Sequence, residues 1–408
     1  MLNIRKDNWL ITNSFASWPP GSPDASKDSE DYVTNVLEAS CDDLLSTPER
    51  SRSVKSLHRM GSARKCRSSK CSLFNEESRT TRAVQWASTA GYPEFSYRTM
   101  KLSDVDIRLL KVAVSDDGLA VGWLEVYPLL ECPRFAALSY MWGSGEQLQT
   151  SLINGEEFMV SRNLHRFLRV YAARLPGQYI LIDQICIDQS EAAEKSSQVQ
   201  IMPHIYRRAA KVIIWIHPSR QSYCYINNQD RHWYGGEKSP ICEKLQDLLE
   251  NEYWSRVWIV QEVLLGRART IHYGSSILSW GELGRLVNGS VYCRNRSISK
   301  HLRWLLEHAP GAKANGVDFN EAFGNCYDSG ARDPRDHVYG LQGLFAPELR
   351  LHVDYDISVK EIFIDAVVTY STSPLKTHLG LSLLARSMGI SHKANGPTLD
   401  DLIGELMQ

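Results

Sequence analysis

Strand-like and helix-like segments alternate along this chain from Ile107 onward. Apolar runs typical of strands occupy 107–114, 121–129, 135–143, 178–183, 211–217, 269–274 and 275–280. Segments with helical spacing of apolar residues occupy 164–171, 191–210 and 240–265. Because such a chain can bury its strands between helices, the pattern predicts an α/β fold with a partly parallel sheet flanked by helices.

Local signals add a hairpin and a capped helix to this framework. Asn154-Gly155 joins two alternating segments and is the strongest short-range signal for a two-residue hairpin turn. Ser161 or Asn163 can cap the helix that follows, whose apolar residues recur at helical intervals. Pro203 lies inside the next predicted helix, and we expect a kink or a break there because proline has no amide donor.

Three regions of different composition divide the chain. Residues 1–95 are rich in Ser, Asp and Arg and poor in periodic apolar residues, so we expect a disordered extension. Within it, the segment from Arg50 to Lys70 is basic and lacks acidic residues, which fits either a nuclear-localisation signal or a solvated tail. Residues 96–345 hold the α/β pattern, and residues 346–408 form an extension that is helical in pattern, most clearly at 359–371.

Composition and motifs exclude several classes of function. The 46 basic and 47 acidic residues give a net charge of −1, so the protein as a whole has no positive potential that would attract nucleic acid, and we expect no nucleic-acid partner. The nine cysteines form no CxxC pair, and we expect reduced thiols and no metal site. Neither a signal peptide nor a run of about 18 apolar residues is present, so we expect a soluble cytoplasmic protein without a membrane segment. The missing GxxxxGK[ST] and GxGxxG motifs disfavour P-loop hydrolysis and Rossmann-type hydride transfer.

Four blocks of sequence resemble the heterokaryon-incompatibility (HET) domain of filamentous fungi. They are ALSYMWG at 137–143, LIDQICIDQ at 181–189, SRVWIVQEVLL at 255–265 and RDPRDHVYGLQGL at 332–344. The resemblance implies a cytoplasmic module that triggers programmed cell death on non-self recognition, associates with itself and responds to a partner that the sequence does not identify. Leu181 stands where Trp is usual in that family and Asp188 where Asn is usual, which leaves a degraded or specialised copy as an alternative.

A more distant resemblance links the same region to the Toll/interleukin-1 receptor (TIR) domain. Residues 205–263 are similar to the TIR segment in which a helix and a strand lead to a Ser-x-Trp-Cys-x-x-Glu-Leu helix. Many TIR domains cleave NAD⁺ at the nicotinamide–ribose bond with the glutamate of that helix. Glu262 is the matching residue and Trp258 stands at the tryptophan position, whereas Ile259 replaces the cysteine. The resemblance therefore implies a TIR-like (flavodoxin-like) sheet, Glu262 as the catalytic carboxylate, and NAD⁺ as a substrate rather than a resident cofactor.

Other candidate residues lie where predicted strands end, because ligands bind at the carboxyl ends of strands in open α/β sheets. Aromatic side chains at this edge can pack against the adenine or nicotinamide ring, although they can equally belong to the core. Asp183 can likewise either bind a ligand or cap the following segment. The candidate NAD⁺-binding residues are Ser139, Tyr140, Trp142, Gly143, Asp183 and Trp258.

The role of Glu262 has two interpretations. Its apolar neighbours on a helix would raise the pKa of its carboxyl group, and a desolvated carboxylate needs a partner or a function. The first interpretation is catalysis. The second is a structural ion pair with Arg256, Arg267 or Arg269, in which case the chain is a non-enzymatic signalling module that acts through self-association or partner recruitment.

Overall fold

A computed structural model describes the chain in segments that all lie in one of its two compact units, Pro48–Gln408. The described residues are 92–114, 120–143, 148–175, 177–218, 240–274, 276–289, 298–308, 316–371 and 378–390. The predicted disordered extension, with the segment from Arg50 to Lys70, lies outside these residues apart from 92–95. Within the described ranges, no helix combines the length and the apolar content needed to cross a membrane.

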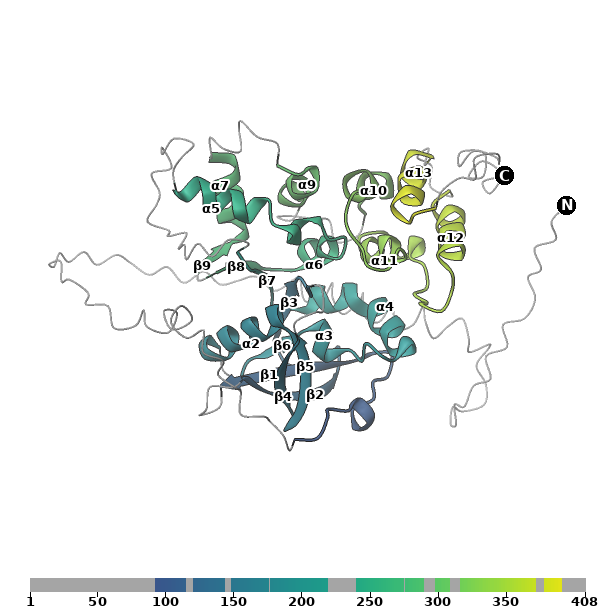
Figure 1. Cartoon of the computed structure of the whole chain (residues 1–408). Coiled ribbons are helices and arrows are strands. Elements are labelled where there is room, and N and C mark those ends of the chain that lie inside the picture. Colours follow the sequence, from purple (N-terminus) through teal and green to yellow (C-terminus); the bar gives the residue numbers. More distant parts are fainter. Residues whose placement is uncertain are drawn as a thin grey trace, which may run out of the picture. The chain divides into compact units, whose positions relative to one another are not determined.

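The described strands form one mixed sheet of nine strands (Figure 1). In chain order they are β1 (Asp106–Val114), β2 (Ala120–Pro128), β3 (Phe135–Tyr140), β4 (Leu148–Ile153), β5 (Glu156–Ser161), β6 (Tyr179–Leu181), β7 (Lys211–Ile216), β8 (Arg269–Tyr273) and β9 (Ser276–Ser279). Their order across the sheet is β5-β4-β2-β1-β6-β3-β7-β8-β9. The prediction of an α/β fold with a partly parallel sheet is confirmed.

The centre of the sheet is parallel. β3 pairs in parallel with β6 on one side and with β7 on the other, and β7 pairs in parallel with β8. The chain thus runs from β3 to β6 on one side and then crosses to β7 on the other, which is the order that flavodoxin-like sheets use. In such sheets ligands bind outside the carboxyl ends of the strands where the order reverses, here at β3 and β7. The likeness to TIR domains stays a prediction.

Helices cover the sheet and extend beyond it (Figure 1). The first group is η2 (Tyr97–Thr99), α2 (Arg162–Arg174), α3 (Asp183–Cys186), α4 (Ala192–Arg208), α5 (Pro240–Leu249), η3 (Glu252–Ser255) and α6 (Ile259–Leu265). The second is α7 (Trp280–Gly289), α9 (Lys300–His308), α10 (Phe319–Cys326), α11 (Asp336–Gln342), η4 (Pro347–Leu349), α12 (Val359–Ser371) and α13 (His378–Ser387).

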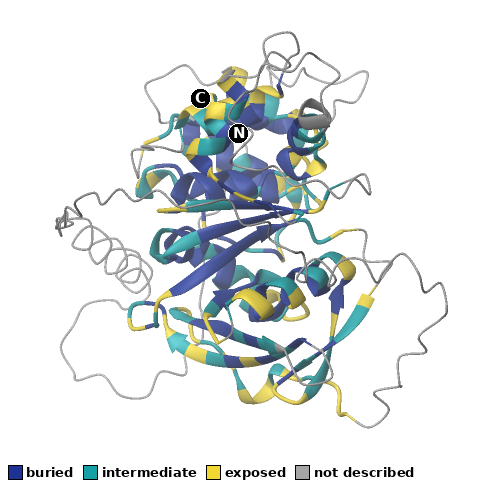
Figure 2. Cartoon of the chain, turned by 90° about the vertical axis from the view of Figure 1, so that its left-hand side faces the viewer, coloured by how far each residue is buried: buried dark blue, intermediate teal, exposed yellow. Residues whose placement is uncertain are grey.

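Packing centres on β3 and α6. All six residues of β3 are buried, as expected of a strand covered on both faces (Figure 2). α6 packs on β3, and α4, α9 and α11 contact α6 in turn. On the antiparallel side of the sheet, α2 packs over β1, β2, β4 and β5. The C-terminal helices join the same core, because Tyr370 of α12 stacks on Phe319 of α10 with ring centroids 5.0 Å apart.

The local predictions have clear outcomes. Asn154 and Gly155 have φ angles of 54° and 80° and join β4 to β5, as a type I′ hairpin turn requires. The Ser161 side chain caps α2 by accepting a hydrogen bond from the Leu164 amide. α4 is not broken at Pro203 but continues through it to Arg208.

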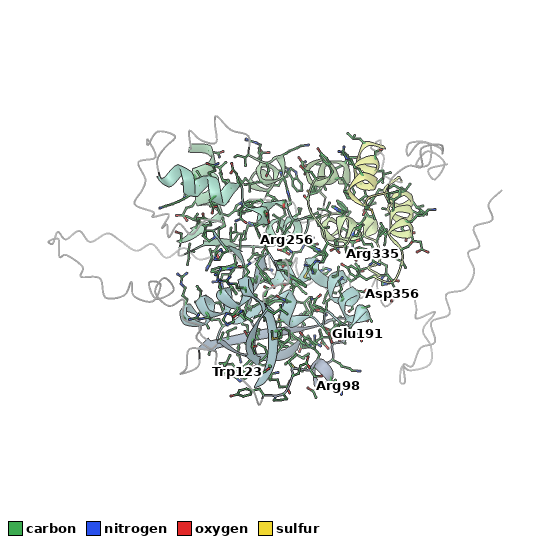
Figure 3. All side chains as sticks on the ribbon, viewed as in Figure 1. Arg98, Trp123, Glu191, Arg256, Arg335 and Asp356 are labelled. Atoms are coloured by element: carbon green, nitrogen blue, oxygen red, sulfur yellow. The ribbon has the colours of Figure 1, made fainter. Side chains whose placement is uncertain are left out.

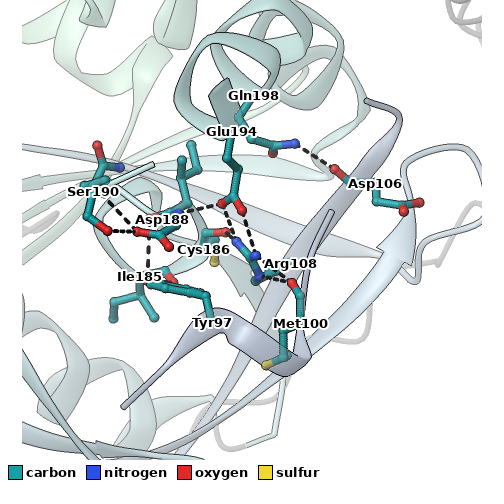
Figure 4. A network of polar contacts seen from close by, with 12 residues as sticks. Tyr97, Met100, Asp106, Arg108, Ile185, Cys186, Asp188, Ser190, Glu194 and Gln198 are labelled. Carbon is teal, nitrogen blue, oxygen red and sulfur yellow. Dashed lines mark hydrogen bonds and ion pairs between the residues drawn. The ribbon is translucent and has the colours of Figure 1, made fainter. Parts of the chain in front are cut away.

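A buried ion pair ties β1 to the start of α4 (Figure 4). The Arg108 guanidinium, which is fully buried, donates from Nη1 to Glu194 Oε1 at 2.5 Å and from Nη2 to Glu194 Oε2 at 2.9 Å. Its remaining donors reach the carbonyl oxygens of Met100 and Cys186. Glu194 also accepts the Asp188 amide at 2.6 Å. Because both charges are buried and paired, removing either side chain would leave the other without its counter-charge.

Candidate functional site

The centre of the candidate site is a buried contact between β3 and α6. The Ser139 hydroxyl, near the carboxyl end of β3, donates a hydrogen bond to Glu262 Oε2. The Tyr253 hydroxyl, from η3, lies 2.5 Å from Ser139 Oγ and donates to it. Glu262 is 5% exposed and Ser139 is 1% exposed, so water has little access to this contact. Two regions that are distant in sequence, β3 and the segment from η3 to α6, therefore meet at this contact.

Burial determines the protonation of Glu262. Loss of hydration raises the pKa of the Glu262 carboxyl to about 7, and the nearby carboxylate of Asp183 acts in the same direction. The Arg256 guanidinium and the hydrogen bonds from Ser139 and Tyr206 oppose this shift without cancelling it. A carboxyl group with a pKa near 7 can accept or release a proton at neutral pH.

None of the three predicted arginines forms an ion pair with Glu262 among the described contacts. Arg256, labelled in Figure 3, acts on the charge of Glu262 from a distance. Its Nη1 donates to the Tyr140 carbonyl oxygen. Arg269 donates to the carbonyl oxygens of Val263 and Leu264 at the end of α6. Arg267 is exposed. Within the described residues, the direct partners of Glu262 are hydroxyl groups rather than cations.

A second pair of candidates meets nearer the surface. Trp142 follows β3, and its Nε1 donates to Asp183 Oδ2 at 2.9 Å across the end of β6. Both side chains are partly exposed. Desolvation raises the pKa of the Asp183 carboxyl, whereas Arg256 and the Trp142 bond lower it. Tyr140 is buried and donates from its hydroxyl to Gln184 Oε1 at 2.9 Å, which links the end of β3 to α3.

Two further polar contacts hold the segment after β3. Asn163 Nδ2, at the start of α2, donates to the Met141 carbonyl oxygen at 2.8 Å. Arg332 Nη2 donates to the Gly143 carbonyl oxygen at 3.4 Å. Gly143 is exposed and has a φ of 81°, a left-handed conformation that glycine adopts without strain. Residues 141–143 therefore have a defined position at the edge of the sheet.

The Trp258 side chain contacts different neighbours from those of Glu262. It caps α6 rather than belonging to it, and its side chain donates a hydrogen bond to Asp336 of α11. Its ring also packs near Gly340, where an added Cβ would lie 3.6 Å from Trp258 Cδ2. Every residue of α6 is buried, so different faces of this helix meet different neighbours. The helical spacing of Trp258 and Glu262 does not bring them to one surface.

The structure also places groups that the sequence did not select. Tyr253 completes the hydrogen-bonded chain to Glu262. Arg256, which the sequence suggested only as an ion-pair partner of Glu262, acts on the charge of both Glu262 and Asp183. Only the proximity of Tyr253 to the SRVWIVQEVLL block could have suggested it. Cys186 is buried and desolvation raises the pKa of its thiol to about 12, as expected of a packing residue rather than a nucleophile. No three His, Cys, Asp or Glu side chains of the described residues are grouped to hold a metal ion.

Part of the chain matches a known protein family. Residues 135–262, from the start of β3 to Glu262, match the family model described as heterokaryon incompatibility protein (HET). The chain is also 31% identical over 180 residues to heterokaryon incompatibility protein 6, OR allele, of Neurospora crassa. That match covers 40% of this chain and 26% of the relative, so it spans about a quarter of the relative's length. No solved structure matches the chain.

Proposed function

Since this chain carries a HET domain, we propose that it acts in fungal heterokaryon incompatibility, where recognition of non-self leads to programmed cell death. The matched residues contain β3, α4 and the chain up to Glu262, and thus nearly all of the candidate site. The name of the Neurospora relative refers to the same process.

We further propose that the site cleaves NAD⁺ at the nicotinamide–ribose bond, with Glu262 as the catalytic carboxylate. The observation that carries this proposal is a carboxyl group with a pKa of about 7 that lies where β3 meets α6, close to the edge at which open α/β sheets bind ligands. The TIR resemblance of residues 205–263 supports the same assignment.

The chemistry suits one such group. The bond between nicotinamide N1 and ribose C1′ breaks, both of its electrons leave with the neutral nicotinamide, and an oxocarbenium-like centre remains on the ribose. Water then forms a bond to C1′ and loses a proton, which the Glu262 carboxylate accepts. A negative carboxylate also stabilises the developing positive charge. Since nicotinamide leaves without needing a proton, no separate acid is required.

The surrounding residues would position the substrate. Asp183 would accept hydrogen bonds from ribose hydroxyls, and the Trp142 ring, fixed by its bond to Asp183, would pack against an aromatic ring of the nucleotide. Ser139 and Tyr253 would orient the Glu262 carboxyl group. Arg256 would keep part of the Glu262 population ionised at neutral pH, because its charge lowers the pKa of that group.

A second candidate function follows from the low exposure of Glu262. Its carboxyl group is 5% exposed and its hydrogen-bond partners are internal, as expected of a residue that joins β3 to α6. In that case the chain is a non-enzymatic signalling module that acts through self-association or partner recruitment. Glu262→Gln would then lower stability without affecting NAD⁺.

Release of nicotinamide from NAD⁺ by the full chain at high protein concentration distinguishes the two functions. The test variant is Glu262→Gln, which keeps the shape of the side chain and removes its charge. Glu252→Gln is the matched control, because Glu252 lies on the adjacent η3 and is exposed. Thermal unfolding of each protein shows whether it is folded.

NAD⁺ cleavage predicts release by the wild type and by Glu252→Gln, and a loss of at least about 100-fold in Glu262→Gln. Full activity in a folded Glu262→Gln protein would refute the catalytic role. A folded, concentrated wild-type protein that releases no nicotinamide would favour the signalling module.

A further inference from the structure

The sheet has an apolar surface on the face of β2, β4 and β5 that α2 does not cover. Successive residues of a strand point to opposite faces, and on these strands one face is buried and the other is not. Leu124 and Ile153 are buried on the face that packs against α2. On the other face, Trp123 (labelled in Figure 3) and Met159 are each 48% exposed and Leu148 is 46% exposed. Large apolar side chains are therefore open to water on this face.

These side chains are neighbours along and across the strands. The parallel pairing of β2 with β4 sets Val121 opposite Leu152. The antiparallel pairing of β4 with β5 sets Thr150 opposite Met159. Residues two apart on a strand share a face, so Trp123 lies beside Val121 and the even-numbered residues of β4 all lie on this side. The apolar stripe, as we call this surface, consists of Trp123, Val121, Leu152, Met159 and Leu148.

The apolar stripe is too small to hold a second copy of the chain by itself. Three strands about 4.8 Å apart, over about six residues at ~3.4 Å each, present a face of roughly 300 Å². A stable complex between two proteins buries about 800 Å² on each partner. A segment of the same chain needs less area, because its tether keeps it at a high effective concentration. The size of the stripe therefore favours an occupant from the same chain.

The chain enters the described fold at the edge of this face. Residues 93–95 lie along β5, where the Glu157 amide donates to the Pro93 carbonyl oxygen at 2.8 Å and the Phe95 amide donates to the Glu157 carbonyl oxygen at 3.0 Å. The bridge is parallel, so the chain before Pro93 leaves towards the turn between β4 and β5, which is the end of the sheet where Trp123 lies. Ninety-two residues precede Pro93.

The charge at this edge complements the chain that precedes it. Glu94 and Glu157 lie opposite each other in the bridge, and like charges in that position repel. No cation forms an ion pair with either carboxylate among the described residues. Residues 78–91, SRTTRAVQWASTAG, contain two arginines and no acidic residue, and we call them the leading segment. Val84 and Trp86 are two positions apart, so in an extended chain they would point to the same side.

We propose that the leading segment docks on the apolar stripe and covers it with Val84 and Trp86. The tether is long enough, because Trp86 lies seven residues before Pro93, which spans about 23 Å when extended. Trp123, on β2, is three strand spacings from residues 93–95, or about 14 Å. Docking removes the large apolar side chains of both partners from water, which is the driving force for the contact.

Hydrogen–deuterium exchange of the full chain measures docking as protection of the amides of residues 83–90. The test variant is Trp123→Ser, which removes the largest side chain of the stripe. Ile277→Ser is the matched control, because Ile277 is equally exposed but lies on β9, at the opposite edge of the sheet. We expect these amides to exchange at least about tenfold more slowly in the wild type and in Ile277→Ser than in Trp123→Ser. Trp86→Ser, which leaves the sheet unaltered, should lose the same protection.

Exchange of these amides at the rate of an unstructured chain in the wild type would overturn the proposal. Full protection in a folded Trp123→Ser or Trp86→Ser protein would do the same, and thermal unfolding shows whether each variant is folded. Sedimentation of the wild type at several concentrations tests for a second copy on the stripe. Protection that rises with concentration, together with a dimer that Trp123→Ser abolishes, would assign the stripe to that second copy and refute docking of the leading segment.

Discussion

Replacing Glu262 by Gln should change how the stability of the protein depends on pH. The carboxyl group of Glu262 has a pKa of about 7 in the folded chain, against an ordinary value of 4.5. The folded state therefore holds this proton more tightly than the unfolded state does. Its stabilising effect is fully present below pH 4.5 and is lost as the pH rises through 7. A glutamine at this position has no proton to lose.

The magnitude follows from the two pKa values. At about 1.4 kcal/mol per pH unit, the difference between 7 and 4.5 corresponds to a loss of about 3 kcal/mol in the free energy of unfolding. Most of this loss, roughly 2–3 kcal/mol, falls between pH 5 and pH 8. Glu262→Gln should therefore gain that much stability relative to the wild type over this interval.

Urea unfolding followed by tryptophan fluorescence at pH 5 and pH 8 measures the effect. The wild type, Glu262→Gln and the exposed control Glu252→Gln are compared, and we expect the control to follow the wild type at both pH values. A constant difference between the wild type and Glu262→Gln from pH 5 to pH 8 would show that burial does not raise the pKa of this group.

Three further predictions concern stability and can be checked by the same urea titrations. Glu194→Gln should lower the free energy of unfolding by about 3–5 kcal/mol because it leaves buried Arg108 without its counter-charge, and adding Arg108→Met should recover part of that loss, unless the two residues act independently. Gln261→Met should raise it by about 1 kcal/mol or more, since both polar atoms of this fully buried amide have no hydrogen-bond partner among the described residues. A decrease would contradict this reasoning. Gly343→Ala should lower it by about 1–3 kcal/mol, as the new Cβ would lie 2.5 Å from Cγ of the rigid Pro203 ring, and an unchanged midpoint would show that the ring moves aside.

Two predictions that depended only on neighbouring residues were confirmed, the hairpin turn and the helix cap. The hairpin at Asn154-Gly155 depends on two left-handed φ angles, which Asn and Gly adopt more readily than other residues. The cap at Ser161 depends on a hydroxyl group that accepts a hydrogen bond from an amide three residues further along the chain. The φ preference and the side-chain cap each involve only a few neighbouring residues, so the local sequence is enough to predict both features.

Predictions that depended on distant partners were incomplete. Ser139 and Glu262 are 123 positions apart, and only the packing of α6 on β3 brings them into contact. The same packing turns Trp258 towards α11 and leaves Glu262 with hydroxyl partners instead of an arginine. A helix that is buried on every side has no single functional face, so helical spacing could not indicate which neighbour each side chain would meet.

From its sequence alone, this chain could be recognised as an α/β protein with HET-like blocks, and Asp183 and Glu262 could be selected as candidates, because strand periodicity and motif spacing are local properties. Only the tertiary structure decided that Glu262 bonds to Ser139 and that Trp142 bonds to Asp183. The physical reason is that the pKa and the partners of a side chain depend on burial and on charges supplied by segments far away in the sequence.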